Sequence, residues 1–275
     1  MKKNRATKIL VLIAACFLVL GIAFSIVGYA LGGIYLKNVK TDSLNESINQ
    51  TVTALDISIN YGTFKIIKSD EFKIIANNFK ENTLSCEIKN GKLTIKEQSS
   101  NWFNFDVMFL WGKHTPELTV YIKGGVIFQN VSIDVGAGEL SINDVSASNL
   151  VLECGAGKVG GNNITADKSK LSNGAGEMDL KNVDLKNSNI SCGAGKVGLS
   201  GKLSGETKID NGVGQTQLNI NGAKNDYYIN ASNGVGKVSI NGSDYRKDDF
   251  DKNAGNTINV SNGVGEVGIT FHNQQ

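Results

Sequence analysis

The stretch GAGELSINDVSASNLVLEC, residues 136–154, is followed by three segments that begin in the same way. They are GAGKVGGNNITADKSKLSN (155–173), GAGEMDLKNVDLKNSNISC (174–192) and GAGKVGLSGKLSGETKIDN (193–211). Gly-Val-Gly then starts at 212, 234 and 263, so the first five starts are spaced by 19 residues and the last two intervals are 22 and 29. A fixed period this short is the sequence signature of a stacked repeat.

Each unit carries two glycines around one small apolar residue, and we expect this Gly-x-Gly to form a bulge or a corner. Glycine supplies the backbone freedom that such a feature needs. The repeat turn glycines are Gly136, Gly138, Gly155, Gly157, Gly174, Gly176, Gly193, Gly195, Gly212, Gly214, Gly234, Gly236, Gly263 and Gly265.

Apolar residues alternate with period two on each side of the Gly-x-Gly, which is the pattern of a β-strand. We expect four columns of mainly apolar residues to face the core. In the first copy they are represented by Ile133, Ala137, Leu140 and Ile142. The alternation slips by one residue across the second glycine, which also indicates a bulge or corner.

A unit of 19 residues is too short to enclose a core alone, so the units must stack. Parallel stacking in register, about 4.8 Å apart, buries each apolar column against its copies. Helical repeats need roughly 33 residues or more, and glycine at this density would break a helix. The sequence therefore predicts an all-β fold, a parallel β-solenoid with 19-residue rungs.

One outward column supports this register independently. The residue directly after the second glycine alternates in charge or is neutral: Glu139, Lys158, Glu177, Lys196, Gln215, Lys237, Glu266. Like charges on adjacent strands repel, so alternation is what a parallel ladder favours. We interpret the column as stabilising the stack.

The N-terminal part has the pattern of a membrane anchor. Residues 9–36 carry no charge, and as a helix these 28 residues extend ~42 Å, enough for a ~30 Å hydrocarbon core. Four basic residues precede this segment, against Lys37 and Lys40 after it. The excess of positive charge places residues 1–8 in the cytoplasm and the remainder outside it, in a single-pass protein with one N-terminal transmembrane helix.

Two alternatives to an uncleaved anchor remain open. A cleaved signal peptide has a shorter apolar region than this one. The segment Ile13-Ala14-Ala15-Cys16 is similar to a lipoprotein cleavage box, which would make Cys16 a lipidated N-terminus, but apolar residues continue after it.

The remaining chain divides into a linker and a solenoid. Residues 37–50 are expected to form a polar linker, and residues 51–275 the extracytoplasmic solenoid. Within the solenoid, residues 51–130 show irregular N-terminal rungs with an aromatic insert, and residues 131–271 hold the regular repeat.

Local signals refine this division. Tyr61-Gly62-Thr63 is similar to a divergent first rung, and Asn90-Gly91 between alternating segments indicates a hairpin or rung turn. The insertion 244–253, which lengthens the last interval, is expected to be a solvated loop. Its aspartates do not have the spacing of a calcium-binding loop.

The aromatic insert is the candidate ligand or partner patch. It contains Trp102, Phe103, Phe105, Phe109 and Trp111. It either covers the open end of the solenoid, where an unprotected strand edge would invite pairing, or forms an exposed patch for a glycan, a protein or the membrane surface.

The sequence motifs that would indicate catalysis, cofactor binding or metal binding are weak. Three Gly-x-Gly-x-x-Gly matches recur with the repeat and precede strands, whereas dinucleotide binding needs a helix N-terminus there. His114 and His272 are the only histidines, and no catalytic or metal-binding pattern surrounds them. We therefore predict a protein that is not an enzyme, without cofactor or metal; a polysaccharide-degrading enzyme on a solenoid is the less favoured alternative.

The charge balance excludes nucleic-acid binding, and the cysteine spacing excludes a disulfide between Cys154 and Cys192. Without the four basic residues before the anchor, the chain has 24 basic and 26 acidic residues, so no basic field for nucleic acid exists. Cys154 and Cys192 share a column but lie two rungs apart, ~9.6 Å at strand spacing. A disulfide needs Cα atoms within ~7 Å, so we expect free, buried thiols with Asn173 between them.

Several segments resemble the bacterial putative-adhesin family of membrane-anchored β-strand-repeat proteins. They are YGTFKIIKSD (61–70), NGKLTIKE (90–97), PELTVYIKGGVIFQNVSIDVGAGEL (116–140), YYINASNGVGKVSINGSDYRK (227–247) and NTINVSNGVGEVGITF (256–271). The resemblance covers about residues 50–271 and implies a right-handed parallel β-solenoid in the cell envelope. It supplies no catalytic residues.

The function that this resemblance implies is binding, scaffolding or sensing of envelope stress at the bacterial cell membrane. Expected partners are the membrane itself and either envelope membrane proteins or cell-wall glycan. The alternative is a surface adhesin that binds a glycan or a host ligand through the aromatic insert.

Overall fold

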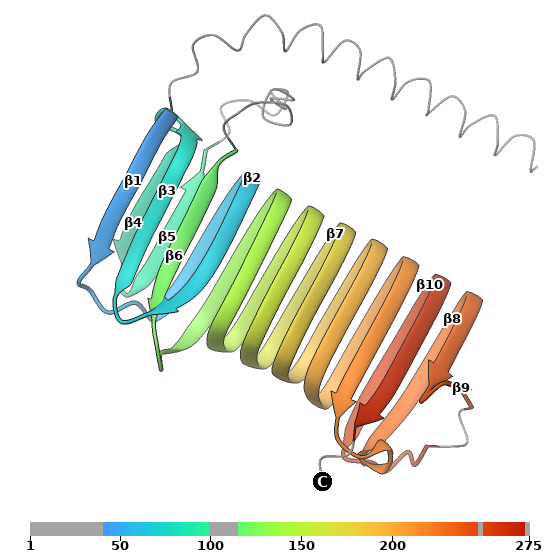
Figure 1. Ribbon diagram of the computed structural model, residues 1–275. Coiled ribbons are helices and arrows are strands. Elements are labelled where there is room, and N and C mark those ends of the chain that lie inside the picture. Colours follow the sequence, from blue (N-terminus) through green and yellow to red (C-terminus); the bar gives the residue numbers. More distant parts are fainter. Residues whose placement is uncertain (1–40, 99–114, 247–249, 273–275) are drawn as a thin grey trace, which may run out of the picture.

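The computed structural model describes residues 41–98, 115–246 and 250–272, and the described chain is almost entirely β-strand (Figure 1). The strands are β1 (Thr41–Ile48), β2 (Ala54–Ser69), β3 (Phe72–Lys80), β4 (Leu84–Lys89), β5 (Lys92–Glu97), β6 (Glu117–Lys123), β7 (Ile127–Asn221), β8 (Tyr227–Ile240), β9 (Ser243–Asp244) and β10 (Asn256–His272). A short 3-10 helix, η2 (Lys224–Asp226), precedes β8. Within these ranges no helix is long and apolar enough to cross a membrane. The predicted span 9–36 lies outside them and stays a prediction.

The predicted stack of rungs is confirmed. β7 is a continuous strand of 95 residues that passes from one rung to the next, and Figure 1 shows its turns side by side along the molecule. β2 is the first rung, because its Tyr61 and Gly62 pair in parallel with Ala137 and Gly138. Corresponding positions of successive units therefore lie in register, as the repeat predicts.

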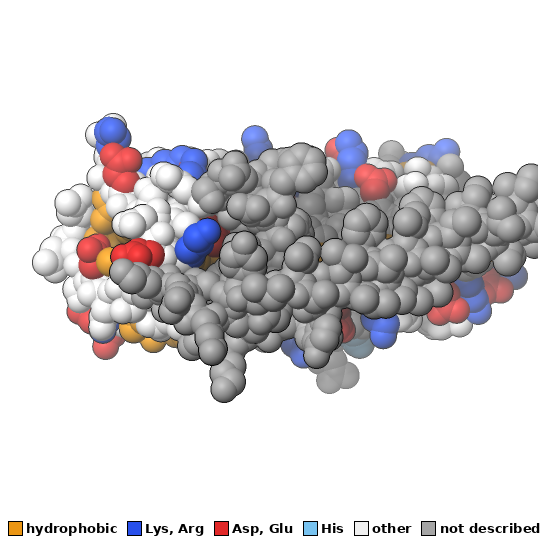
Figure 2. Space-filling model, turned by 90° about the horizontal axis from the view of Figure 1, so that it is seen from above, with side chains coloured by type: hydrophobic (Ala, Val, Ile, Leu, Met, Phe, Trp, Pro, Cys, Tyr) orange, Lys and Arg blue, Asp and Glu red, His pale blue; other side chains and the backbone are white. Residues whose placement is uncertain are grey.

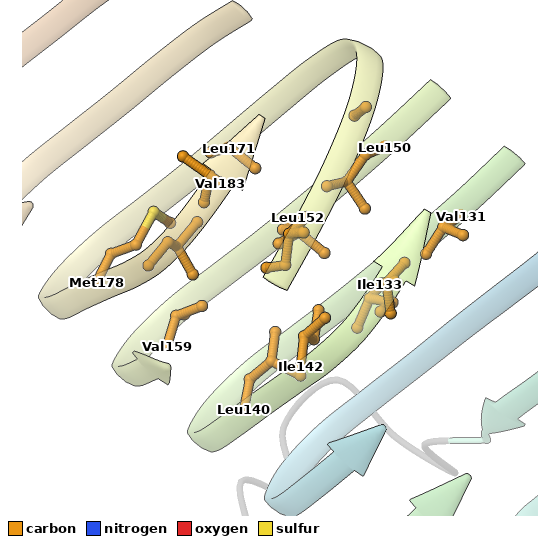
Figure 3. Close-up of a cluster of buried hydrophobic side chains, with 14 of the residues drawn as sticks. Val131, Ile133, Leu140, Ile142, Leu150, Leu152, Val159, Leu171, Met178 and Val183 are labelled. Atoms are coloured by element: carbon orange, nitrogen blue, oxygen red, sulfur yellow. The ribbon is translucent and has the colours of Figure 1, made fainter. Parts of the chain in front are cut away.

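Three of the four predicted columns face the core. Ile133, Leu140 and Ile142 are fully buried. Figure 3 shows these side chains inside the coil, next to their equivalents in the following rungs, Leu152, Val159, Leu171 and Met178. This burial explains the period-two pattern on each side of the glycines.

The prediction for the fourth column is wrong, because the residue between the two glycines lies at the surface. Ala175 is exposed, and Val213, Val235 and Val264 are 55%, 67% and 48% exposed. The column directly before the first glycine, which includes Asn173, faces the core instead. The reason is that the chain turns a corner here, and the Gly-x-Gly and the charged residue after it lie on the convex, outer side of that corner.

The corner requires glycine for a steric reason. Gly157 has a φ of 130°. A Cβ on Gly157 would lie closer than 3.0 Å to the carbonyl oxygen of Gly138 in the preceding rung, and the same relation joins Gly176 to Gly157. The rungs approach each other at strand spacing here because neither carries a side chain.

A second corner uses asparagine and aspartate. Asp144, Asn163 and Asn182 have φ values of 57°, 57° and 50°, a left-handed conformation that these residue types tolerate. Their side chains also connect the rungs. The Asn163 amide donates to the Asp144 carboxylate, and the Asn182 amide donates to the side-chain oxygen of Asn162 at 2.8 Å.

The order of the last rungs in space differs from their order in the chain. β10 lies between β7 and β8 and pairs in parallel with both. Glu266 therefore lies beside Gln215 on one side and Lys237 on the other. The outward column still alternates in charge, so the predicted ladder is kept although its last two members exchange places.

This exchange explains the unequal last intervals of the repeat. Between β7 and β8 the chain must pass the position of β10, and residues 222–226, which include η2, make this crossing. Between β8 and β10 the chain must return, and residues 241–255 connect the two strands. The intervals of 22 and 29 residues thus hold the extra chain that skips one rung and comes back.

The N-terminal end of the stack is covered by three further strands. β6 pairs in parallel with the second half of β2, and β3 and β1 follow in antiparallel pairing, β3 with β6 and β1 with β3. Residues 41–48, expected as part of a polar linker, instead form β1. Only Leu44 and Ile48 of β1 pack against the core, so the strand carries too few apolar residues to be recognised. The predicted turn at Asn90-Gly91 is confirmed between β4 and β5.

The C-terminal end is covered by the insertion that we expected to be a solvated loop. Phe250 is 8% exposed, and its ring stacks at 6.0 Å on that of Tyr245. The Tyr245 hydroxyl donates to the carbonyl oxygen of Ile229 in β8 at 2.9 Å. The Lys224 ammonium lies 4.7 Å from the centre of the Phe250 ring. The described part of 244–253 is therefore an end cap, not a free loop.

Candidate functional site

The predicted aromatic patch lies outside the described residues. Trp102, Phe103, Phe105, Phe109 and Trp111 all belong to the segment 99–114, as does His114. Neither the cap nor the ligand-patch interpretation is tested, and both stay predictions. The other histidine, His272, ends β10, where its carbonyl oxygen accepts a hydrogen bond from the Gly222 amide at 3.0 Å.

The predicted free thiols are confirmed but are poor nucleophiles. Cys154 and Cys192 are free and buried, and they share a column with the buried Asn173. Burial raises the pKa of both thiols. A thiol with a raised pKa is the reverse of what nucleophilic catalysis needs. In the described part of the chain, no cluster of three His, Cys, Asp or Glu side chains could hold a metal ion.

One feature that the repeat does not explain is a depression of about 730 Å³ beside the second corner. We call it the crossover notch. It is lined by Asn182, Val183, Asp184, Gly201, Lys202, Asn221, Gly222, Ala223 and Asp226. Three successive turns of β7 and the crossing segment before β8 contribute these residues.

The notch begins where the series of aspartate and asparagine residues at the second corner ends. The next rung after Asn182 carries Gly201 in place of an asparagine or aspartate, with a φ of 146°. A Cβ on Gly201 would lie closer than 3.0 Å to the backbone nitrogen and oxygen of Val183. The backbone of Gly201 therefore packs on the rung before it, and no side chain fills the corner above.

The far wall is the crossing segment, which is held in place by Asn256. The Asn256 side-chain oxygen accepts from the Gly205 amide at 2.9 Å, and its amide group donates to the carbonyl oxygen of Asp226 at 3.1 Å. Tyr227 lies below this wall, with its hydroxyl donating to the carbonyl oxygen of Leu203 at 2.8 Å. Asn256 thus ties β10, β7 and the end of η2 together at the rim.

The electrostatics of the notch are set by two carboxylates and one ammonium group. Burial, and then the charges of Asp226 and Asp184, raise the pKa of the Tyr227 hydroxyl. Both carboxylates therefore lie close enough to act on the same buried ring. Across the residues that the structure describes, no ion pair or side-chain hydrogen bond engages Asp184, Lys202 or Asp226.

Elsewhere along the solenoid, some charges are paired. Lys186 and Asp167 lie 3.2 Å apart on neighbouring rungs, and Lys181 and Asp179 lie 3.3 Å apart. In the view of Figure 2, basic and acidic side chains lie near each other on the described part of the surface. Within the described chain, the notch brings two unpaired carboxylates and one unpaired ammonium group together in a single depression.

Sequence reasoning missed the notch, although two of its signals are visible there. Gly201 breaks the series Asp144, Asn163, Asn182, and the interval that contains the crossing segment is 22 residues instead of 19. Neither signal shows that the two irregularities meet in space. That depends on the exchange of β8 and β10.

The fold and its corner chemistry define the class of protein, an all-β stack of in-register parallel rungs built on Gly-x-Gly corners. A sequence profile of the Toastrack DUF4097 family matches residues 52–257, so the chain belongs to this family. The resemblance to a family of adhesin-like repeat proteins is thereby confirmed.

Several solved structures are similar in fold. One from Clostridium sporogenes is described as a "putative cell adhesion protein"; it is 17% identical, with 85% of this chain and 100% of that chain covered and a TM-score of 0.39. A "putative adhesin" from Parabacteroides distasonis is 15% identical, with coverages of 86% and 98% and a TM-score of 0.43. A "putative lipid binding protein" from the same species is 12% identical, with coverages of 86% and 95% and a TM-score of 0.37. No curated protein matches the chain.

Proposed function

We propose that this chain is a non-enzymatic protein of the bacterial cell envelope that serves as a rigid scaffold for binding partners or sensing envelope stress. Residues 9–36 cross the membrane once, residues 1–8 are cytoplasmic, and the right-handed solenoid stands outside. The uncharged length of the span and the positive charges before it support this arrangement.

The observation that carries the proposal is the continuity of the stack. β2, β7, β10 and β8 form one unbroken series of parallel rungs, with covering strands at one end and the Tyr245–Phe250 pair at the other. Each rung contacts its neighbours through buried columns and hydrogen-bonded ladders. Such a rod holds surface groups at fixed spacings, which suits presentation and recognition.

The experiment is proximity crosslinking of the full-length protein in native membranes, followed by mass spectrometry, with protease accessibility of tags at both termini. Recovery of envelope membrane proteins, with only the C-terminal tag cleaved in intact cells, supports the proposal. Cleavage of the N-terminal tag, or of neither tag, contradicts the proposed topology.

A second candidate function is adhesion through the aromatic insert. Five aromatic residues in ten positions favour it, because such residues dominate recognition surfaces. In this case, replacing Trp102 and Trp111 together by alanine abolishes binding to the glycan or host surface but leaves the unfolding temperature unchanged. A collapsed fold in the double variant would identify the insert as a structural cap.

A further inference from the structure

We infer that the crossover notch is a binding site for a hydroxyl-rich ligand that carries an amino group, such as an amino-sugar segment of a glycan. The inference rests on the proposed function, since an extracytoplasmic domain is what would meet such a polymer. It adds the site and the chemical class of the ligand.

The position of the notch is the first argument. In the three rungs before it, the second corner carries Asp144, Asn163 and Asn182, and the Asn163 and Asn182 amides each donate to a side chain of the preceding rung. At Gly201 this series of side chains ends, and the crossing segment, residues 222–226, lies beside the open corner. Stacking explains the regular rungs, but it does not require an open depression here.

The availability of the charged groups is the second argument. Asp184, Lys202 and Asp226 line one depression, yet within the described ranges none of them is engaged by an ion pair or a side-chain hydrogen bond. Carboxylates accept hydrogen bonds from hydroxyl and ammonium groups, whereas a lysine ammonium donates to hydroxyl oxygens. Two acids against one base leave an excess negative charge, which favours a ligand with a cationic amine.

The shape of the lining is the third argument. Gly201 is buried, and Gly222 and Ala223 are half-buried, so small residues separate the charged side chains and leave the depression open. A Cβ on Gly222 would lie 3.2 Å from the ring of Tyr227, which supports the floor from below. The volume, about 730 Å³, is within the ~300–1,000 Å³ of small-ligand sites. Since the lining is polar and open, we expect weak binding of a polar ligand.

Calorimetric titration of the full-length protein in detergent tests the site, with two sugar tetramers of equal length as probes. Tetraglucosamine carries an amine on each ring, and cellotetraose carries only hydroxyls. At a slightly acidic pH, where the amines are protonated, tetraglucosamine is expected to bind more tightly. Asp184→Asn and Asp226→Asn should each weaken tetraglucosamine binding by about tenfold and affect cellotetraose less.

A matched control separates the notch from the general charge of the protein. Asp210→Asn removes the same charge from an exposed position elsewhere on β7 and should leave both affinities unchanged. Equal losses in Asp210→Asn and Asp226→Asn would overturn the inference, as would a lack of preference between the two probes. The topology experiment is independent: correct topology without sugar binding overturns only this inference, and sugar binding with the opposite topology overturns only the proposed function.

Discussion

Glu266 lies beside Gln215 in the outward column at the Gly-x-Gly corner, in the place that Lys237 would take if the rungs followed the order of the chain. The acidic group thereby separates a neutral residue from a basic one. Lys237 also binds Asp244 of β9 at 2.9 Å, and this contact and Glu266 raise the pKa of the lysine. The end of the rod is thus closed by a short ladder of opposite charges.

Glu266→Lys should test this arrangement. The variant places two lysines side by side on adjacent strands, where like charges repel. We expect a lower midpoint of chemical unfolding, by a small amount because both groups are exposed, and recovery of most of the loss at high salt. Glu266→Gln is the control and should behave nearly as the parent. A loss in Glu266→Lys that salt does not change would argue against the electrostatic explanation.

Gly157→Ala should be strongly destabilising. The new Cβ would collide with the carbonyl oxygen of Gly138, and the φ of 130° is unfavourable for alanine. We expect a loss of roughly 3 kcal/mol in the free energy of unfolding. Gly160→Ala is the matched control, since the nearest atom to its Cβ would be 4.0 Å away. Similar stabilities of the two variants, measured by urea titration, would contradict the role of the corner.

Asn173→Val should stabilise the protein. Both polar atoms of the buried Asn173 side chain lack a hydrogen-bond partner in the described structure, and the same column holds Val135 in an earlier rung. Removing an unsatisfied buried amide should raise the free energy of unfolding by ~1–3 kcal/mol.

Asn211→Val is the comparison for this change, because the Asn211 amide donates to the Asn262 side chain at 2.8 Å. It should destabilise the stack by leaving Asn262 without that bond. Thermal melts of both variants report the difference, and a loss of stability in Asn173→Val would show that its amide is satisfied in solution.

Deleting whole rungs should shorten the rod without unfolding it. Removal of residues 155–192 takes out two units and joins Cys154 to Gly193, so that Glu139 is followed by Lys196 and the charge alternation is kept. Removal of residues 155–173 alone places Glu139 beside Glu177. The longer deletion is expected to keep a cooperative melt and to shorten the rod by ~9.6 Å in small-angle scattering. If the shorter deletion proves more stable than the longer one, the charge column is unimportant.

Stability should fall at alkaline pH through the half-buried thiol of Cys86. Burial, and secondarily the charge of Glu46, raise the pKa of Cys86 from 9.0 to about 11. The unfolded thiol ionises first, so its contribution to stability is complete below pH 9.0 and is lost as the pH rises toward about 11. Cys86→Ser should reduce the slope of the urea midpoint against pH in this window. An unchanged slope would show that this thiol is ionised equally easily in both states.

The sequence by itself determined the repeat unit, its strands and its corners. These features are local: Ile133, Leu140 and Ile142 face the core because the side-chain period of a strand is two. Gly157 is needed because two backbones meet at one point. The same logic failed for Ala175, since the alternation cannot show on which side of a bulge the slipped residue emerges. It also failed for β1, in which Leu44 and Ile48 are a weak signal.

Only the tertiary structure decided the order of the last rungs, the end cap and the crossover notch. β8 and β10 have nearly the same pattern around Gly-Val-Gly, so either could pair with the last turn of β7 as far as local residues show. The choice depends on contacts between distant segments, such as those of Asn256 with Gly205 and Asp226, and on which rung Tyr245 and Phe250 can cover. The notch follows from that choice, because the chain must leave β7 at Asn221 and cross over the rung formed by β10 before it begins β8.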